Sequence, residues 1–345
     1  MTKFVSWQDD EENLYTLPSV DPLGVLSSTR LVVEQGETVW INPEQVEILC
    51  QRWLYEDAQR ATPNRPQWDT HYHFSDATER SVNWLLVLDA LNFCFWAEKG
   101  QKPWTIEYQG EILNGYWAEA AALKRAAEEN IPLWDAEFLS KISEETMAHI
   151  FRGNGTIPLL EQRVANAREV GRVLLAHYNG QFSQMIKLAQ GSAVKLALLL
   201  VQHLSSFDDT ALYRTHTIRF YKRAQICVAD LYSACGGQQW GAFNDLEQLT
   251  IFADYKLPQV LRHTNVLEYQ TRLAERVDNR ELIAAGSEEE VEIRAATIWA
   301  CELLRRAMLR HGQQTTAAEI DLRLWHLGQQ AMDMRPYHRT RTIYY

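Results

Sequence analysis

Apolar residues recur at intervals of three and four along most of the chain beyond residue 135, which is the period of an α-helix with one buried face. Glycines stand between these periodic segments, where helices commonly end. The pattern predicts helices over residues 135–151, 158–178, 181–189, 191–204, 216–234, 257–276, 288–311 and 316–330. The sequence therefore predicts a mainly α protein, with any sheet confined to the first third of the chain.

The first third combines helical and strand-like patterns. Asn42-Pro43 is typical of a helix start, with Asn as the cap and Pro in the first turn, and predicts a helix to about residue 59. The run 81–95 is apolar and too long for one strand, so it predicts a buried helix. Trp104–Tyr108 alternates as a strand does and precedes a Gln-Gly turn, and the Ala-rich segment 115–130 predicts a helix. We therefore expect a small β element in the N-terminal third.

No long linker or low-complexity segment divides the chain, and no fixed-period self-similarity indicates a repeat array. We predict one compact helical body over residues 1–345. Within it, residues 1–41 have no clear period and are expected to wrap the surface rather than join the core. Residues 42–134 are expected to form helices with a small sheet, and residues 135–345 to be helical.

The formal charge of the 345-residue chain is −11, from 34 Lys and Arg against 45 Asp and Glu. Proteins bind nucleic-acid duplexes through clustered Lys and Arg that displace counterions from the phosphates. The acidic balance therefore argues against a duplex as the ligand, and it leaves a single small nucleotide open. We expect a small-molecule substrate and a monomeric protein.

The five cysteines are scattered and form no Cys-x-x-Cys pair, so zinc and iron–sulfur spacings are absent from the sequence. An odd number of isolated thiols favours a reducing compartment. The N-terminus lacks an apolar signal-peptide core, and the longest apolar run, Leu196–Val201, is too short to span a bilayer. Dinucleotide, Walker and zinc-protease signatures are also missing. We predict a cytoplasmic protein with no membrane segment, metal ion or cofactor.

Asp254 follows three apolar residues and stands shortly before Pro258, at a break between two predicted elements. A carboxylate in apolar surroundings is poorly hydrated and held in one place. Two interpretations are open from the pattern: Asp254 caps the following helix or pairs with a structural charge, or it is a catalytic group.

Lys222 and Asp230 are charged residues on an otherwise apolar helical segment. Helical spacing places Lys222, Ile226 and Asp230 along one line, at i, i+4 and i+8. On the pattern alone, a half-buried salt bridge between Lys222 and Asp230 explains this arrangement as well as a binding site does.

Residues 88–96, Leu-Asp-Ala-Leu-Asn-Phe-Cys-Phe-Trp, end the predicted buried helix in three aromatic residues and a cysteine. Such stripes are most often core. A buried amide such as Asn92 needs hydrogen-bonding partners, and the edge of a base offers a matching donor and acceptor. Asn92 is therefore either a core residue or a ligand contact.

His71 and His73 would lie on one face of a short strand at residues 71–74. Metal binding needs further ligands, and no partner motif accompanies the pair. A contact between His73 and a phosphate or ribose is favoured over a metal site.

Four quoted segments occur in order along the chain: 88–96; Phe-Tyr-Lys-Arg-Ala-Gln-Ile at 220–226; the Asp254 stretch at 251–262; and His-Arg-Thr-Arg-Thr-Ile-Tyr-Tyr at 338–345. Together they resemble the queuosine salvage family, the queuosine 5′-phosphate N-glycosylases. The resemblance covers most of the chain and implies an all-helical fold related in shape to helix-hairpin-helix DNA glycosylases. The Leu-Pro-Gly-Val-Gly hairpin and cluster cysteines of those DNA enzymes are missing here, which argues against a grip on duplex DNA.

The resemblance implies hydrolysis of queuosine 5′-monophosphate to queuine and ribose 5-phosphate, a salvage step for tRNA modification. Cleavage of an N-glycosidic bond leaves positive charge on C1′ and O4′, and a fixed carboxylate stabilises that charge more in the transition state than in the ground state. The resemblance implies that Asp254 does this or activates the attacking water. It also places Lys222 in the nucleotide pocket, pointing toward Asp254, and leaves Asp230 a structural role.

The implied leaving base is a 7-deazaguanine, which has no N7 to protonate. Help for its departure is expected from hydrogen bonds to its Watson–Crick edge and from aromatic side chains. The expected contacts are Tyr255, Gln259, Asn92 and Phe220 for the base, Lys222 and His73 for the phosphate or ribose, and Phe93 and Trp96 as further ligand contacts.

Two other functions stay open on the sequence: a non-catalytic helical protein that binds a nucleotide or base, and a DNA-type glycosylase. A basic stripe on the folded surface would favour nucleic acid. An enclosed pocket containing Asp254 would favour the free nucleotide.

Overall fold

The computed structural model describes residues 14–59, 68–330 and 333–345. In these ranges the chain forms fourteen α-helices, three short 3₁₀ turns and three two-stranded antiparallel ribbons. The prediction of a mainly α fold is therefore confirmed. Residues 1–13 of the predicted wrapping segment lie outside the described residues.

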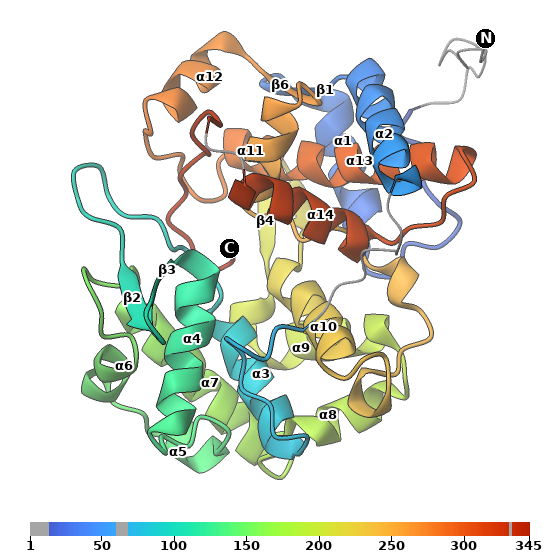
Figure 1. Ribbon diagram of the computed structural model, residues 1–345. Coiled ribbons are helices and arrows are strands. Elements are labelled where there is room, and N and C mark those ends of the chain that lie inside the picture. The colour runs from blue at the N-terminus through green and yellow to red at the C-terminus, as the bar shows by residue number, and fades with distance from the viewer. Residues whose placement is uncertain (1–13, 60–67, 331–332) are drawn as a thin grey trace.

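The helices follow one another with short connections. In chain order they are α1 (Val25–Gln35), α2 (Pro43–Ala58), α3 (Glu79–Leu91), α4 (Gly115–Glu128), α5 (Ala136–Ser140), α6 (Glu144–Ile150), α7 (Leu160–His177), α8 (Phe182–Ala189), α9 (Ala193–His203), α10 (Lys222–Ala234), α11 (Lys256–His263), α12 (Thr271–Asp278), α13 (Glu288–Arg310) and α14 (Ala317–Gln330). The 3₁₀ turns are η1 (Ser205–Phe207), η2 (Gln239–Gly241) and η3 (Leu246–Gln248). Figure 1 shows α3–α8 in one half of the molecule and α1, α2 and α11–α14 in the other, with the C-terminus between them.

The strands form three short ribbons rather than one sheet. β1 (Val39–Ile41) pairs with β6 (Leu267–Tyr269), β2 (Thr105–Tyr108) with β3 (Glu111–Asn114), and β4 (Thr210–Tyr213) with β5 (His216–Arg219). β2 confirms the strand predicted around residues 104–108. The prediction that strands are confined to the first third is wrong, because β4, β5 and β6 lie later in the chain. The strand suggested at residues 71–74 is also wrong, since turns occupy that segment.

Local sequence accounts for several helix starts. The Asn42 side chain accepts a hydrogen bond from Gln45 N at 3.2 Å, and Pro43 occupies the first turn of α2, as predicted. Ser287 caps α13, where three successive glutamates in the first turn complement the positive end of the helix dipole.

Some predicted helices are divided or shortened because tertiary contacts interrupt them. The segment predicted as 135–151 forms α5 and α6, and 257–276 forms α11, β6 and α12. The segment predicted as 216–234 begins as β5, and α10 starts only at Lys222. The buried run predicted as 81–95 leaves the helix after Leu91 and continues as an extended segment to residue 98.

The described part of residues 1–41 joins the core, which corrects the expectation that this segment only wraps the surface. Val25 and Val32 of α1 are buried against α13, and β1 pairs with β6. The helical period of α1 is obscured by Ser27-Ser28-Thr29. Thr29 is nevertheless fully buried, because its hydroxyl donates to Val25 O at 2.7 Å.

Two helices organise the interior around the site. α3 is buried at every residue from Val82 to Leu91 and packs against α7, α8 and α10. α13 packs against α1, α2, α11 and α14. One cluster of buried apolar side chains extends from Leu23 to Leu324. This packing brings the start of α10, the segment before α11 and the middle of α14 to one space.

Candidate active site

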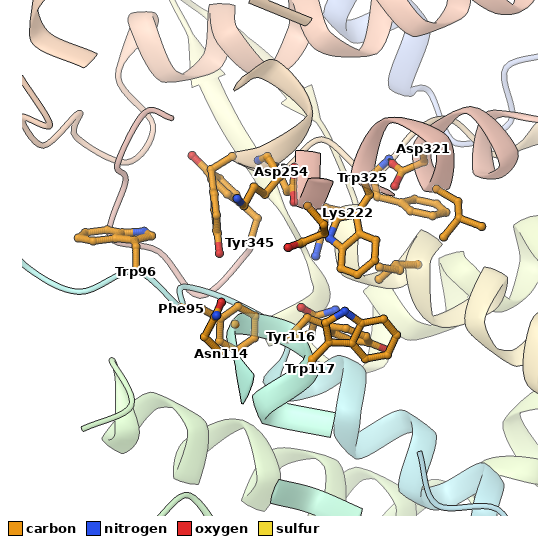
Figure 2. A pocket seen from close by; sticks show the side chains of 18 of the residues that line it. Phe95, Trp96, Asn114, Tyr116, Trp117, Lys222, Asp254, Asp321, Trp325 and Tyr345 are labelled. Carbon is orange, nitrogen blue, oxygen red and sulfur yellow. Dashed lines mark hydrogen bonds between the residues drawn. The ribbon is translucent and has the colours of Figure 1, made fainter. Parts of the chain in front are cut away.

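A cavity of about 1260 Å³ is enclosed by the extended segment after α3, the start of α4, α10, the segment before α11, α14 and the C-terminal segment. This volume is large enough to enclose a nucleotide. In Figure 2, Trp96 lies at one end of the cavity and Asp321 and Trp325 at the other, with Asp254 and Lys222 between them.

Asp254 caps a helix, as the first interpretation from the sequence requires, and it also lines the cavity. Its Oδ1 accepts hydrogen bonds from Lys256 N at 2.8 Å and Leu257 N at 2.9 Å, so it caps the start of α11. Its side chain also lines the cavity, and Oδ2 has no hydrogen-bonding partner among the described residues. Burial raises the pKa of Asp254, while Lys222 and the two main-chain N–H groups oppose that rise.

Lys222 is the first residue of α10 and is only 5% exposed. Its main-chain N donates to Asp209 Oδ2 at 3.2 Å, and Asp209 forms a bidentate ion pair with Arg294 at 2.9 and 2.5 Å. The Nζ of Lys222 forms no hydrogen bond or ion pair with any residue that the structure describes. Burial lowers the pKa of Lys222, whereas Asp254 and Asp321 favour its charged form. A buried, unpaired ammonium beside an unpaired carboxylate oxygen is available to a ligand.

Three further carboxyl groups surround Lys222. Asp230 and Asp321 line the cavity, and Asp89 lies fully buried behind them on α3. Burial raises the pKa of Asp230 to about 7, against the influence of Lys222. Burial also raises the pKa values of Asp89 and Asp321, and nearby carboxylates raise them further. The helical line of Lys222, Ile226 and Asp230 thus faces the cavity, and Asp230 belongs to its wall.

Arg163 fixes the point where α3 ends. Its guanidinium donates to the main-chain carbonyls of Leu91, Phe93 and Cys94, which a continuing helix would have used internally. The chain therefore leaves the helix at Asn92 and runs along the cavity. The buried Asn92 side chain lines the cavity and has no hydrogen-bonding partner among the described residues, as the expected ligand contact requires.

His73 lines the cavity but is already engaged within the protein. Its Nδ1 lies 2.7 Å from Asp69 O and its Nε2 2.8 Å from the Tyr116 hydroxyl, and its ring stacks on Trp68. Burial lowers the pKa of His73 to about 4, so the ring is neutral near pH 7. A neutral imidazole with both nitrogens engaged does not support the expected contact with a phosphate. The ring instead holds the Tyr116 hydroxyl in place.

Aromatic side chains form two walls of the cavity. Tyr255 and Trp96 line it as expected, and Tyr255 packs on Tyr337 with ring centres 4.8 Å apart. On the other side, Trp117 and Trp325 are in edge contact at 5.6 Å. Flat rings on opposite sides of a cavity are suited to hold a base.

Positive charge gathers near Trp96. The guanidinium of Arg339 lies 5.5 Å from the Trp96 ring and donates to Ala97 O at 3.0 Å. Lys256 and Arg280 line the same cavity, with Lys256 Nζ 5.3 Å from the Tyr337 ring. This end of the cavity is suited to an anionic group.

Three expected contacts do not line the cavity. Phe220 lies beneath the guanidinium of Arg294, and Phe93 packs under Arg163, so both rings belong to the buried framework. Gln259 donates to Arg335 O at 2.7 Å and is not among the residues that line the cavity. The geometry does not support a substrate contact for these three residues.

Sequence reasoning missed several lining residues. Tyr345 was part of a quoted segment, and its main-chain O accepts from Cys94 N at 2.9 Å, which anchors the C-terminal residue beside the cavity. Asp321 stands between the apolar residues Ile320 and Leu322, an unusual place for a carboxylate and a usable signal. Further lining residues that were missed include Phe95, Asn114, Tyr116, Trp117 and Trp325.

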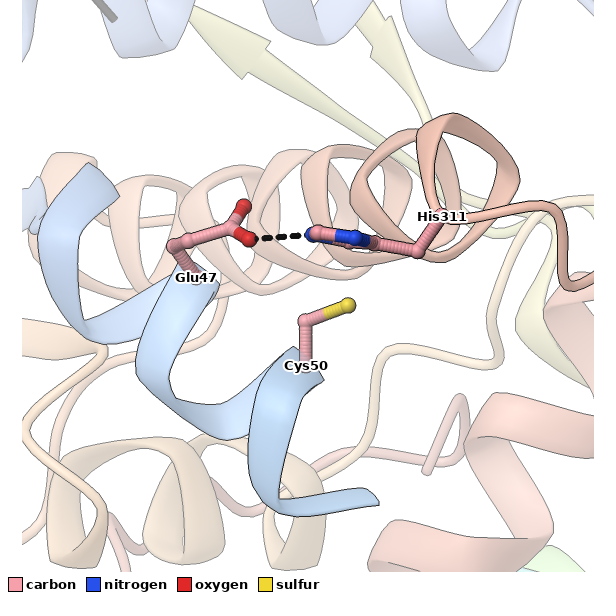
Figure 3. Close-up of side chains that lie close together, drawn as sticks. All are labelled: Glu47, Cys50 and His311. Carbon is pink, nitrogen blue, oxygen red and sulfur yellow. Dashed lines mark hydrogen bonds and ion pairs between the residues drawn. The ribbon is translucent and has the colours of Figure 1, made fainter. Parts of the chain in front are cut away.

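Glu47, Cys50 and His311 form the one group with metal-type spacing among the described residues, with ligand atoms within 4.8 Å of one another (Figure 3). The sequence concealed this group because α2 and the end of α13 are distant in the chain. Glu47 Oε1 lies 2.6 Å from His311 Nε2, and burial raises the pKa of Cys50 to about 11. An ion-paired carboxylate and a protonated thiol explain the group without a metal. None of the three lines the cavity.

Comparison with known proteins agrees with a nucleotide-sized cavity as the functional site. A family model described as queuosine salvage protein matches residues 71–345. The chain belongs to the queuosine salvage protein family. A relative from Sphaerobacter thermophilus named queuosine 5′-phosphate N-glycosylase/hydrolase is 49% identical over 326 residues, which cover 94% of this chain and 98% of the relative. Relatives of the same name from Mus musculus and Schizosaccharomyces pombe are 34% and 30% identical, cover 94% and 91% of this chain and span 99% of their own length.

The resemblance carried by the four quoted segments is thereby confirmed. Asp254, Lys222 and every expected contact that lines the cavity fall within the part of the chain that matches the queuosine salvage family. No helix in the described parts of this family member has both the length and the apolar character needed to cross a bilayer.

Proposed function

We propose that this protein hydrolyses the N-glycosidic bond of queuosine 5′-phosphate and releases queuine and ribose 5-phosphate. The observation that carries the proposal is the presence of Asp254 Oδ2 and Lys222 Nζ, both without a protein partner, inside one nucleotide-sized cavity. The relatives' names supply the substrate, and the site supplies groups with the chemistry that its cleavage needs.

Asp254 stabilises the positive charge that develops on the ribose as the bond to the base breaks. Its Oδ1 is fixed by the N-terminus of α11, so Oδ2 is held in one orientation before the reaction begins. A preorganised charge in a water-poor site is worth several kcal/mol, about 3–4 by comparison with single oxyanion donors. The same oxygen is placed to orient the attacking water as a general base.

Lys222 favours the ionised form of Asp254. Burial favours the protonated form of the Asp254 carboxyl group, and the ammonium of Lys222 has the largest opposing effect on its pKa. An ionised Asp254 is required both for charge stabilisation and for water activation. The three N–H bonds of Lys222 Nζ also offer donors to the ribose hydroxyls.

The charged and aromatic side chains differ between the two ends of the cavity. The 5′-phosphate is assigned to the end near Trp96, where Arg339, Arg280 and Lys256 gather. The base is then assigned to the other side of Asp254, beside Trp117 and Trp325. Asn92 also lines the cavity and is available for the polar edge of the base. Phosphate binding far from the reacting bond would order the sugar for cleavage.

The test is release of base from queuosine 5′-phosphate by wild type and by Asp254→Asn. Asparagine keeps an oxygen for the α11 cap and removes the charge. We expect substrate binding to persist and the single-turnover rate to fall at least about a hundredfold. Asp135→Asn is the matched control, because Asp135 caps α5 through Phe138 N at 2.9 Å and does not line the cavity. A wild-type single-turnover rate for Asp254→Asn would contradict the role proposed for the Asp254 charge in cleavage.

We also propose that the protein acts as a monomer on the free nucleotide, in the cytoplasm, and not on duplex nucleic acid. The net charge of −11 supports a free nucleotide over a duplex. The cysteines are all free thiols, which supports a reducing compartment. The position of Asp254 in the wall of a nucleotide-sized cavity favours this activity over the DNA-type glycosylase considered from the sequence.

A further inference from the structure

The end of the cavity near Trp325 has carboxyl oxygens that the protein leaves unsatisfied. Asp321 is 8% exposed, and its Oδ2 accepts from Phe252 N at 2.8 Å, whereas its Oδ1 has no partner among the described residues. Asp89 and Asp230 are buried carboxyl groups within hydrogen-bonding reach of each other, and neither accepts a hydrogen bond from a main-chain N–H, Lys or Arg among the described residues. Buried polar atoms are normally paired, so this group requires an explanation.

The charges at this place do not balance within the protein. Asp89, Asp230, Asp321 and Asp254 interact electrostatically with one lysine, Lys222. The nearby Arg223 is committed to the main-chain carbonyls of the α3 end and of η1. A buried excess of carboxylates is unfavourable unless protons or another cation neutralise it. The pKa values of Asp89, Asp230 and Asp321 are raised accordingly.

The neighbouring side chains suit an organic cation. Trp325 is in edge contact with Trp117 at 5.6 Å and with Tyr116 at 6.2 Å, and all three rings line the cavity. Aromatic faces beside carboxylates are typical of sites that bind alkylammonium groups. Among the described residues these carboxyl groups do not converge to metal-ligand spacing, which favours an extended organic cation over a metal ion.

We propose that this end of the cavity binds an alkylammonium group carried by the base of the substrate, with Asp321 and Asp230 as its ion-pair partners. The inference rests on the proposed function and deepens it. Queuine carries a secondary amine on the substituent of its deazaguanine ring, and this amine is cationic when protonated. Asp89 contacts Asp230 by a hydrogen bond and lies outside the cavity lining, so it does not touch the ligand. The site thereby selects a modified base over an unmodified one.

The direct test compares queuosine 5′-phosphate with 7-deazaguanosine 5′-phosphate, which lacks the whole substituent that carries this amine. We expect wild type to favour the first in kcat/KM by about tenfold or more, the scale of a hydrogen bond to a charged group. Asp321→Asn should lose most of this preference, because kcat/KM should fall about tenfold more for queuosine 5′-phosphate than for 7-deazaguanosine 5′-phosphate.

Asp230→Asn is the second variant, and it keeps the test decisive if Asp321→Asn folds poorly. Glu247→Gln is the matched control, because Glu247 is an exposed carboxylate on η3 outside the cavity lining. Equal losses on both nucleotides would overturn the proposal, since they would indicate a structural or general catalytic role. An unchanged preference in both variants would overturn it as well.

Calorimetry with the free bases separates this inference from the proposed function. If wild type cleaves neither nucleotide, the proposed function fails, yet tighter binding of queuine than of 7-deazaguanine still supports an ammonium site. Equal affinities for the two bases would overturn it.

We also expect queuine binding to release protons, because an ammonium group favours the ionised form of the carboxyl groups. The number of protons released is measured by calorimetry in two buffers of different ionisation enthalpy. The groups facing Asp230 and Asp321 in this experiment are Asp89 on α3, Tyr116 and Glu119 on α4, Lys222, Arg223 and Cys227 on α10, Asp254 before α11, and Cys301 on α13.

Discussion

At the scale of single residues, the structural contacts of Asp254 and the chemical role proposed for it use different oxygens. Oδ1 holds the first turn of α11, and Oδ2 faces the cavity. The structural task supports the chemical one, because the helix fixes the direction of the free oxygen. The two interpretations drawn from the sequence are therefore compatible, and substitution by Asn separates them.

Lys222 provides a prediction about pH. Removing its charge in Lys222→Met should raise the pKa of Asp254 further, because Lys222 is the first influence that opposes burial. If cleavage needs an ionised Asp254, the acid limb of the kcat/KM profile should move to higher pH, and KM should rise as the donors are lost. Lys222→Arg keeps the charge and should shift the limb less. Superimposable acid limbs for wild type and Lys222→Met would contradict this coupling.

Glu119 on α4 gives a prediction about stability. It is fully buried, its Oε1 lies 3.5 Å from Arg163, and burial raises its pKa to about 8 from 4.5. The folded protein then keeps a proton that the unfolded chain releases, so the free energy of unfolding falls as pH rises from about 4.5 to 8, by up to about 1.4 kcal/mol per pH unit. Glu119→Gln has no such proton and should gain stability relative to wild type across this window. Urea unfolding of both proteins at pH 5 and pH 8 checks this, and a constant difference would contradict it.

At the scale of elements, the end of α3 depends on one side chain from another helix. Arg163→Met would leave the carbonyls of Leu91, Phe93 and Cys94 without their donor. We expect a loss of about 3 kcal/mol or more in unfolding free energy, with weaker substrate binding because Asn92 loses its orientation. Arg172→Met on the exposed side of α7 is the control and should change stability by less than about 0.5 kcal/mol. Equal melting temperatures for the two variants would contradict the role of Arg163.

The hydrogen bonds of Arg163 at the end of α3 also show which helix boundaries the sequence could predict. The start of α2 was predictable because Asn42 and Pro43 act on their own neighbours. The end of α3 at Leu91 was not, because the apolar run continues and the interruption comes from Arg163, more than sixty residues away. The start of α10 at Lys222 likewise depends on Asp209, which holds the Lys222 main-chain N–H.

The same distinction applies to the candidate site. Asp254, Lys222, Asn92, Tyr255 and Trp96 were found through the resemblance, and the structure places all five on one cavity. Asp321 was missed because its approach to Lys222 results from the packing of α14 against α11 and α13, which no local pattern encodes. Phe220 and Phe93 were included because aromatic residues in a quoted segment do not reveal which face of the chain is buried.

At the scale of the whole molecule, the cavity and the Glu47–Cys50–His311 group are separate features. The cavity contains the groups assigned to the chemistry, and the other three residues lie between α2 and α13. We therefore expect prolonged chelation to leave the turnover rate unchanged. The measurement is base release before and after dialysis against a chelator, with zinc added back. Activity that is lost and then restored by zinc would contradict this expectation.

The pairing of β1 with β6 and the packing of α1 on α13 have a consequence for biosynthesis. These contacts join parts of the chain separated by more than two hundred residues. Contacts over such separations form late, because a long loop must close before they are gained. On the ribosome α1 emerges well before α13, so the apolar side chains of Val25 and Val32 stay exposed during most of translation. The N-terminal helix is therefore where the nascent chain most needs protection from aggregation.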